Sequence, residues 1–490
     1  MRHSDNNNWS NSVFCMKEKK WFNVAAIVLG VVFVILVGVL SFFIVHNAEW
    51  LIGDDAILIN KTGWGTPFSI WTTIQPELGR FFPLAYMHEN IVLLFPGEMH
   101  SAAQHYVLNM ILFILLALAL LKTLWLTIKP EKIVDLFIVL MGVILCLSRF
   151  FTTYCNVFST VYLYLTMTGI IVLCVMQYYT TRKKVYAVVP TILFAYLVFC
   201  GECVFIAPLA LGVVTLLFGY KQLSKEQKIF NICIVSVPVL FLLVYFFGIY
   251  LQTTPESLYD PSHGTGVTFF ENALKIIKGQ KFLILAALVW GIRQIALITK
   301  KDSYHVLYDS FLWTAGAILL GGLILKLDWH LYYYSAMLYA LPSVVFFGKK
   351  YFKEIPLLII LVLFAILYSY KVPRVIQTNQ KDRIKHKEFV TYIVDQHLQG
   401  QKIVWHETET NDTMSFDLTL RNWKRNALRT YIQYELKDRT WEYAISEAYD
   451  DCIVLYSKEN DTFGIPPTSL SGLASKNVYD IALYEINQCN

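Results

Sequence analysis

The sequence predicts a mainly α-helical protein that crosses a membrane many times. Of its 490 residues, 56% are hydrophobic and only 16% are charged, and the mean hydropathy of +0.49 lies well above that of a soluble domain. The apolar residues form long runs, and a spanning helix needs about 20 of them. The net charge of +5 is small and comes from short basic clusters between the runs, so we expect no nucleic-acid partner.

Eleven segments are predicted to span the membrane. They are residues 22–44, 103–127, 133–150, 156–177, 185–200, 203–219, 229–251, 282–299, 308–325, 331–348 and 354–370. Only Gly201-Glu202 separates the fifth segment from the sixth, so these two form either a helical hairpin or one broken re-entrant element. The first segment is too long for a signal peptide and lacks a small-residue cleavage site, so we expect an anchor.

The basic residues between the segments predict the orientation of the chain. With a cytoplasmic N-terminus, the inner loops hold most of the Lys and Arg, in clusters such as R-K-K at 182–184 and K-K at 349–350, whereas the outer loops hold few. Cytoplasmic loops carry this excess. Residues 45–102, 252–281 and 371–490 then face the exterior. We expect a multi-pass protein of the bacterial inner (cytoplasmic) membrane.

The composition of the chain changes at about residue 371. Residues 1–370 form the predicted transmembrane domain, and residues 371–490 form a small extracytoplasmic domain of mixed, charged sequence. The pattern of this tail predicts a compact α/β fold. Its expected elements are a helix at 385–398, a strand at 402–406, a helix at 414–434 and a strand at 452–457.

Two adjacent carboxylates, Asp54 and Asp55, closely follow the first span in the stretch L-I-G-D-D-A-I-L. Their apolar neighbours favour burial, and like charges in a half-dry setting repel each other, which raises one pKa unless a cation compensates. A general base or a metal ligand uses such an arrangement. A helix N-cap formed by Gly53-Asp54-Asp55 is the alternative interpretation.

The rest of the first outer loop adds a basic residue and an apolar stretch. Arg80 precedes residues 81–95, which are too short and too interrupted to span, and which we expect to form an amphipathic helix in the membrane interface. A guanidinium at the level of the lipid headgroups binds phosphate oxygens bidentately. The alternative is that Arg80 only extends its charged end to the membrane interface and binds no substrate. Several acids and histidines in the same region could bind a metal, but their spacing matches no strong metal motif: His88, Glu89, Glu98, His100 and His105.

Further candidates for substrate binding lie in other predicted outer loops. The stretch K-L-D-W-H-L-Y-Y-Y combines charge with aromatic rings, which suits phosphate contact and sugar stacking, although an interfacial aromatic belt has the same composition. Arg149 lies on the same face after the third span. Of these positions, Lys326 and His330 join Arg80 as candidates for donor or phosphate binding, and Glu89, Arg149, Asp328 and Tyr332 are candidates for substrate binding.

The topology, the D-D pair at 54–55 and the G-R at 79–80 together resemble the GT-C superfamily of polyprenyl-phosphate-sugar-dependent glycosyltransferases, in particular bacterial members that act on surface polysaccharide. The resemblance implies a sugar transfer, with inversion, from a polyprenyl-phosphate donor to a glycan or lipid acceptor. It implies that Asp54 or Asp55 is the catalytic base or a metal ligand and that Arg80 contacts phosphate. A divalent cation is the one cofactor that it leaves open. Membrane lipids are the remaining expected partners.

Two other classes of function remain open. One is a transporter or flippase for a lipid-linked saccharide, and the other is an outer-face polysaccharide polymerase or ligase. Transporters place polar residues near the bilayer midplane in related halves, whereas here the candidate residues gather on one face and no halves correspond. No P-loop, Rossmann fingerprint or H-E-x-x-H motif is present, which disfavours a nucleotide-driven pump or a metalloprotease of that kind.

Overall fold

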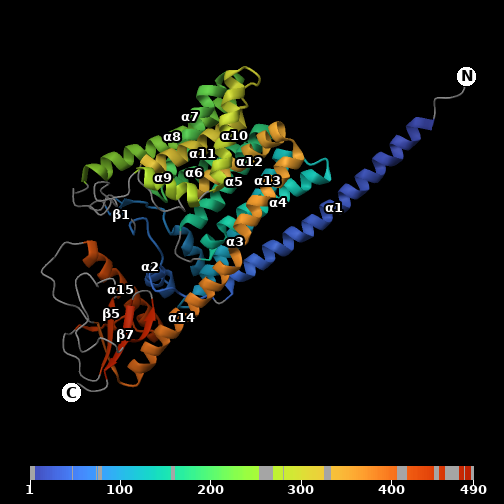
Figure 1. Ribbon diagram of the computed structural model, residues 1–490. Helices are drawn as coiled ribbons and strands as arrows, with labels where there is room; N and C mark the ends of the chain where they lie inside the picture. Colours follow the sequence, from blue (N-terminus) through green and yellow to red (C-terminus); the bar gives the residue numbers. More distant parts are fainter. Residues whose placement is uncertain are drawn as a thin grey trace, which may run out of the picture.

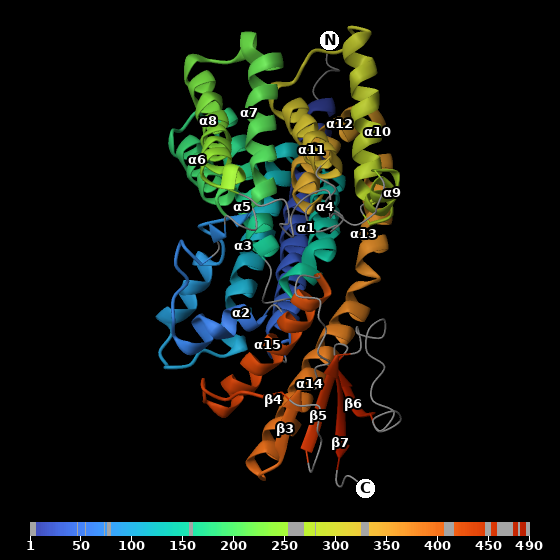
Figure 2. The ribbon, with the colours of Figure 1, turned by 90° about the vertical axis from the view of Figure 1, so that its left-hand side faces the viewer.

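The computed structural model describes most of the chain, and two views at right angles show an elongated molecule (Figures 1 and 2). A bundle of helices forms one end, and a sheet with two helices forms the other. The described residues are 6–46, 48–53, 55–72, 74–75, 80–155, 160–252, 269–279, 281–324, 333–405, 416–445, 452–457, 474–478 and 481–486.

The bundle consists of helices from the first three quarters of the chain. Their bounds are α1 (Asn6–Val45), α3 (Ala102–Ile128), α4 (Ile133–Tyr154), α5 (Thr160–Thr181), α6 (Val185–Val198), α7 (Ile206–Gly219), α8 (Lys225–Gly248), α9 (Phe269–Gly279), α10 (Lys281–Ile298), α11 (Val306–Ile324), α12 (Tyr334–Phe352) and α13 (Glu354–Ser369). Helices α3, α4, α5 and α12 pack against one another at the centre, whereas α1 runs obliquely along one side (Figure 1).

Eight helices of the described chain are long and apolar enough to cross a membrane. Their outward faces carry large aliphatic side chains with no protein neighbour to bury them, for example Ile27 and Val34 of α1 and Ile359 of α13. Such a surface is stable in lipid and not in water. The protein is therefore a mainly α-helical, multi-pass membrane protein.

The eight long helices correspond to eight of the eleven predicted spans. Helices α6 and α7, which cover the fifth and sixth segments, are shorter apolar helices, and a 3-10 turn, η4 (Glu202–Phe205), joins them to each other. Helix α12 covers the tenth segment but ends in Lys349 and Lys350. The predicted number of eleven spans therefore stays a prediction.

The first loop between α1 and α3 is irregular. It contains α2 (Asp55–Asn60), two 3-10 helices, η1 (Thr62–Trp64) and η3 (Met87–Leu94), and the strands β1 (Ile74–Gln75) and β2 (Arg80–Phe81), which pair antiparallel. Where the sequence predicts one amphipathic helix over residues 81–95, the structure has a strand, turns and η3. Asn90 explains part of this arrangement, because its side-chain amide bonds the backbone N–H of Phe68 at 2.7 Å and its carbonyl at 3.0 Å.

The C-terminal part contains two helices and a mixed sheet. These elements are α14 (Val372–Leu398), β3 (Lys402–Trp405), α15 (Phe416–Leu436), β4 (Ala444–Ile445), β5 (Cys452–Ser457), β6 (Ala474–Val478) and β7 (Ile481–Ile486). The strand order is β4-β3-β5-β7-β6. Strand β3 is parallel to β4 and β5, and β7 is antiparallel to β5 and β6. The two predicted strands match β3 and β5, whereas α14 begins 13 residues before the predicted residue 385.

Helices α14 and α15 hold this part of the chain against the first loop. One face of α14 is buried, and its residues Arg383, His386, Val390 and Ile393 follow the three-to-four-residue spacing of a helix. Helix α15 packs on α2, where the side-chain amide of Asn60 donates a hydrogen bond to Thr430 at 3.3 Å. Helix α2, at the start of this loop, thus lies between α3 of the bundle and α15 (Figure 2).

Candidate functional site

Asp55 is the buried acid at the point where the bundle, the first loop and the C-terminal helices meet. It begins α2 and is only 4% exposed. Its Oδ2 accepts the backbone N–H of Leu51 at 2.8 Å, so the acid closes the turn that leads from α1 into α2. The backbone N–H of the next residue, Ile52, donates to Nδ1 of His386 at 2.8 Å.

A buried tyrosine and a buried arginine lie next to this acid. The ring of Tyr106, at the start of α3, interacts electrostatically with Asp55 and with Arg383, and the guanidinium of Arg383 lies 4.1 Å from the centre of that ring. Arg383 also donates to the carbonyls of His46, at 3.1 Å, and Cys155, at 2.7 Å. Carbonyls at the ends of α1 and α4 thus receive donors from the C-terminal helix, as otherwise unpaired helix ends require.

A second buried acid, Glu89, lies at the centre of a group that we call the first-loop polar cluster. Its members are Thr62, His88, Glu89, His105 and Tyr162. Oε2 of Glu89 lies 2.7 Å from Nδ1 of His105, and its Oε1 accepts the hydroxyl of Tyr162 and lies 3.2 Å from Nε2 of His88. Nε2 of His105 is 3.2 Å from the hydroxyl of Thr62. The cluster therefore links η1, η3, α3 and α5 through one carboxylate.

The surroundings of Glu89 keep it ionised. Burial alone raises the pKa of its carboxyl, but the charge of His88 and the hydrogen bonds from His105 and His88 outweigh that effect, so the pKa lies well below its usual range. Trp50 connects this cluster to the turn that holds Asp55, because its ring centre lies 5.2 Å from that of His105. The ring of Trp50 thus lies between the first-loop polar cluster and the turn that Asp55 closes.

The structure places the remaining predicted site residues unequally. Arg149 donates to the carbonyl of Gly279 at 2.7 Å, and its guanidinium lies over the rings of Tyr334 and Tyr368. The backbone of Arg80 pairs with Gln75 in the short hairpin. Five predicted residues lie outside the described part of the chain: Asp54, Lys326, Asp328, His330 and Tyr332.

The structure gives no support for a metal site in the part that it describes. Among those residues, no group of three or more His, Cys, Asp or Glu side chains is arranged to hold a metal ion. In the first-loop polar cluster, His88, His105 and Tyr162 all interact with the carboxylate of Glu89. Asp54 lies outside the described residues, and the divalent cation at the acid pair stays a prediction.

Sequence reasoning missed three of the residues that shape this region. Tyr106 and Tyr162 lie within apolar spans, where a tyrosine resembles ordinary packing. Arg383 lies in the tail, 328 positions after Asp55. The sequence does indicate that Arg383 and His386 share one face of a helix, because they are three residues apart. Only the docking of α14 shows what that face contacts.

Comparison with known proteins adds no assignment. Neither the protein-family models nor the curated proteins include a match to this chain. The class that the structure itself defines is a mainly α-helical, multi-pass membrane protein.

Proposed function

We propose that the protein is an integral membrane glycosyltransferase that transfers a sugar from a polyprenyl-phosphate donor to a glycan or lipid acceptor, with Asp55 as its general base. The supporting observation is the position of Asp55. It is a buried acid at the start of α2, in the turn region that follows α1, and it interacts with Tyr106 of α3, while the nearby Ile52 N–H donates to His386 of α14. A lipid-linked donor keeps its tail in the bilayer and its phosphate at the surface, so the reacting carbon lies just above the end of such a span.

The proposed reaction is a single displacement. The acceptor hydroxyl transfers its proton to the carboxylate of Asp55 while its oxygen forms a bond to the anomeric carbon. The bond from that carbon to the phosphate oxygen breaks, and the lipid phosphate leaves with the electron pair, which inverts the anomeric centre. General-base help of this kind contributes about 10²- to 10⁴-fold. In this proposal Arg80 stabilises the charge on the departing phosphate.

The finer topology belongs to the same proposal. Eleven spans with a cytoplasmic N-terminus place the first loop and the tail outside the bacterial inner membrane. The five-stranded sheet with α14 and α15 then forms an extracytoplasmic α/β domain over the acceptor side of the site. The contact of α15 with α2 supports this arrangement, because it brings the tail onto the loop that carries Asp55.

The test is the loss of a surface glycan in cells that carry Asp55→Asn. This change keeps the shape of the side chain and its acceptor for the Leu51 N–H, but it removes the basic carboxylate. We expect transfer to fall by at least about 100-fold while the purified protein keeps its melting temperature. Mass spectrometry of the surface glycan measures the effect.

Two further variants complete the experiment. Glu49→Gln removes an acid that lies six residues earlier and pairs at the surface with Lys387, so it should keep full transfer. Asp54→Asn shows whether the neighbouring acid is the base instead. Normal glycan in both the Asp54→Asn and the Asp55→Asn cells would refute the proposal, and loss of folding in Asp55→Asn would assign that residue a structural role.

A further inference from the structure

A cavity of about 700 Å³ opens at the opposite end of the bundle from Asp55. Helix α3 shows the separation, because it begins at Ala102 beside the first loop and reaches the cavity with Leu126, Thr127 and Lys129. The other walls come from the end of α5, the 3-10 helix η5 (Tyr220–Gln222), the loop between α10 and α11, and the end of α12. In the predicted topology this end of the bundle faces the cytoplasm.

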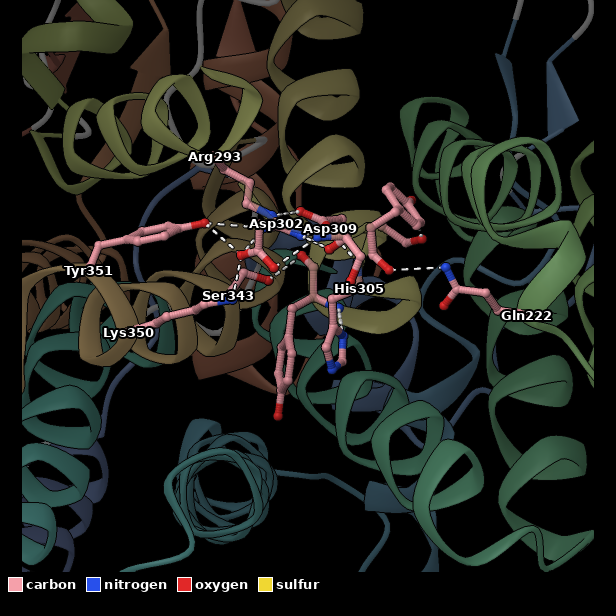
Figure 3. Close-up of polar contacts among 12 residues, drawn as sticks. Gln222, Arg293, Asp302, His305, Asp309, Ser343, Lys350 and Tyr351 are labelled. Atoms are coloured by element: carbon pink, nitrogen blue, oxygen red, sulfur yellow. Dashed lines mark hydrogen bonds and ion pairs between the residues drawn. The ribbon is translucent and has the colours of Figure 1, made fainter. Parts of the chain in front are cut away.

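The wall between α10 and α11 is fixed by a buried ion network (Figure 3). Arg293 of α10, which is fully buried, binds Asp309 of α11 through Nε and Nη2, both at 2.7 Å. Its Nη1 lies 2.6 Å from Oδ2 of Asp302, and its Nη2 donates to the carbonyl of Ser303 at 2.5 Å. Lys350 of α12 pairs with the same Asp302.

This network stabilises the wall of the cavity, and Arg293 has no hydrogen-bonding group left for a ligand. The guanidinium of Arg293 is saturated by partners from α11, from the loop and from Tyr351. It therefore holds the loop of residues 299–305 in one position. From the facing wall, the side chain of Gln222 donates to the carbonyl of Tyr304 at 3.1 Å, which also fixes that loop. A cavity with walls held in this way is a preformed site.

The lining has an excess of positive charge. Among the described residues, four basic side chains line the cavity, Lys129, Arg182, Arg293 and Lys350, against one acidic side chain, Asp302. Asp309, behind the wall, neutralises a second charge. Lys129 and Arg182 are exposed, and within the described chain neither makes a salt bridge, although Arg182 does influence Glu226 electrostatically. Lys129 directly follows α3 and Arg182 directly follows α5, and the helix dipole favours a positive charge at the C-terminal end of a helix. The dipole does not explain why a cavity lies between the two residues.

The rest of the lining mixes polar side chains, such as Thr127, Thr180 and Gln227, with apolar ones. Leu126 and Met176 continue from the two cations along α3 and α5, and Leu307 and Phe347 lie across from them. The lining therefore has a polar part, with cationic, amide and hydroxyl groups, and a smaller apolar part of aliphatic and aromatic side chains. An inorganic anion would satisfy only the first part, whereas a phospholipid satisfies both, with its phosphate on the donors and its acyl chain on the apolar wall.

We propose that this cavity binds the phosphate headgroup of an anionic phospholipid from the bilayer leaflet at this end of the bundle, with Lys129 and Arg182 as the phosphate ligands. Guanidinium and ammonium groups form strong charge-assisted hydrogen bonds with phosphate oxygens. An anionic lipid surface attracts basic residues that lie next to the ends of spanning helices. The site is independent of the sugar transfer proposed at the other end.

The experiment uses the full-length protein in phosphatidylcholine nanodiscs that contain a trace of phosphatidylglycerol with a diazirine near its glycerol. After illumination, peptide mass spectrometry should find the label on the segments that contain Leu126 and Met176. Unlabelled phosphatidylglycerol should displace it. In the double variant Lys129→Gln/Arg182→Gln, labelling there should fall on the order of tenfold, because two charge-assisted hydrogen bonds are lost.

A matched control separates the site from general surface charge. Lys183→Gln/Lys184→Gln removes two exposed charges from the same turn, and these residues do not line the cavity, so labelling should persist. An equal loss in both double variants would overturn the proposal, as would an absence of label on the two segments. Displacement by inorganic phosphate would also overturn it, because the site would then take a free anion.

Discussion

The two ends of the bundle treat charge differently. Beneath the first loop, His105 and Tyr162 bond the two oxygens of the buried Glu89 carboxylate, and Asp55 accepts the backbone N–H of Leu51 through Oδ2. At the other end, the buried ion is Arg293, whose bonds hold a wall, and the cations Lys129 and Arg182 stand exposed at a cavity. The difference teaches that a buried ion whose hydrogen-bonding groups are all paired, such as Arg293 or Glu89, is a structural element. Function is better sought in the groups that such an ion positions.

The largest effect on stability is expected at Arg293. Replacement by Ala leaves Asp309 and Asp302 without their buried partner, and breaking a buried pair in this way costs about 3–5 kcal/mol. Reversible unfolding of the purified protein in mixed micelles measures the loss. Lys301→Ala, an exposed change in the adjacent loop, should cost little, and a similar loss in both variants would show that Arg293 does not fix the wall.

A smaller effect is expected at Glu89. Glu89→Gln keeps the size of the side chain but loses the charge that His105 and Tyr162 bond, which costs about 1.5–3 kcal/mol. Because the folded pKa of Glu89 is lowered, its contribution is complete above the unfolded pKa of about 4.3 and is lost as the pH falls below that value.

Unfolding measured from neutral to acidic pH checks this sign. The difference between Glu89→Gln and the natural protein should shrink as the solution becomes acidic. Glu98→Gln removes an exposed acid from the same loop and should show almost no difference at any pH. A gap for Glu89→Gln that widened toward low pH would contradict the ionised state of this carboxylate.

The smallest effect is expected at Lys350. Its side chain is 49% exposed, so water and salt screen its pair with Asp302, and Lys350→Gln should cost at most about 1 kcal/mol. The loss should disappear at high ionic strength, whereas the loss in Arg293→Ala should persist. A large, salt-independent loss would mean that Lys350 belongs to the buried part of the network.

The sequence was sufficient for what depends on local pattern. Long apolar runs located the spanning helices, and the short apolar runs that begin near Lys402 and Cys452 located β3 and β5. Such runs indicate by their composition alone whether a segment is buried or faces lipid. It was insufficient for what depends on distant partners. Arg293 and Asp309 lie inside segments that looked nearly free of charge, and only the packing of α10 and α11 pairs them.

The candidate site divides in the same way. The sequence pointed to Asp55 and Glu89 individually, since acids next to a span are conspicuous. It did not predict that Trp50 connects them or that α14 supplies Arg383 and His386. These contacts arise from tertiary docking, and the hydrophobic periodicity of a single helix does not predict which other segment that helix packs against.

The junction between α13 and α14 has one further consequence. Backbone hydrogen bonds continue across it, from Tyr370 to Ile366 and from Val375 to Lys371, so the last span and the first tail helix run on as one rod of 45 residues. Each residue of a helix turns it by about 100°. The number of residues between α13 and the sheet therefore determines how the sheet is rotated about the membrane normal. A single residue inserted at the junction would rotate Arg383 away from the carbonyls of His46 and Cys155.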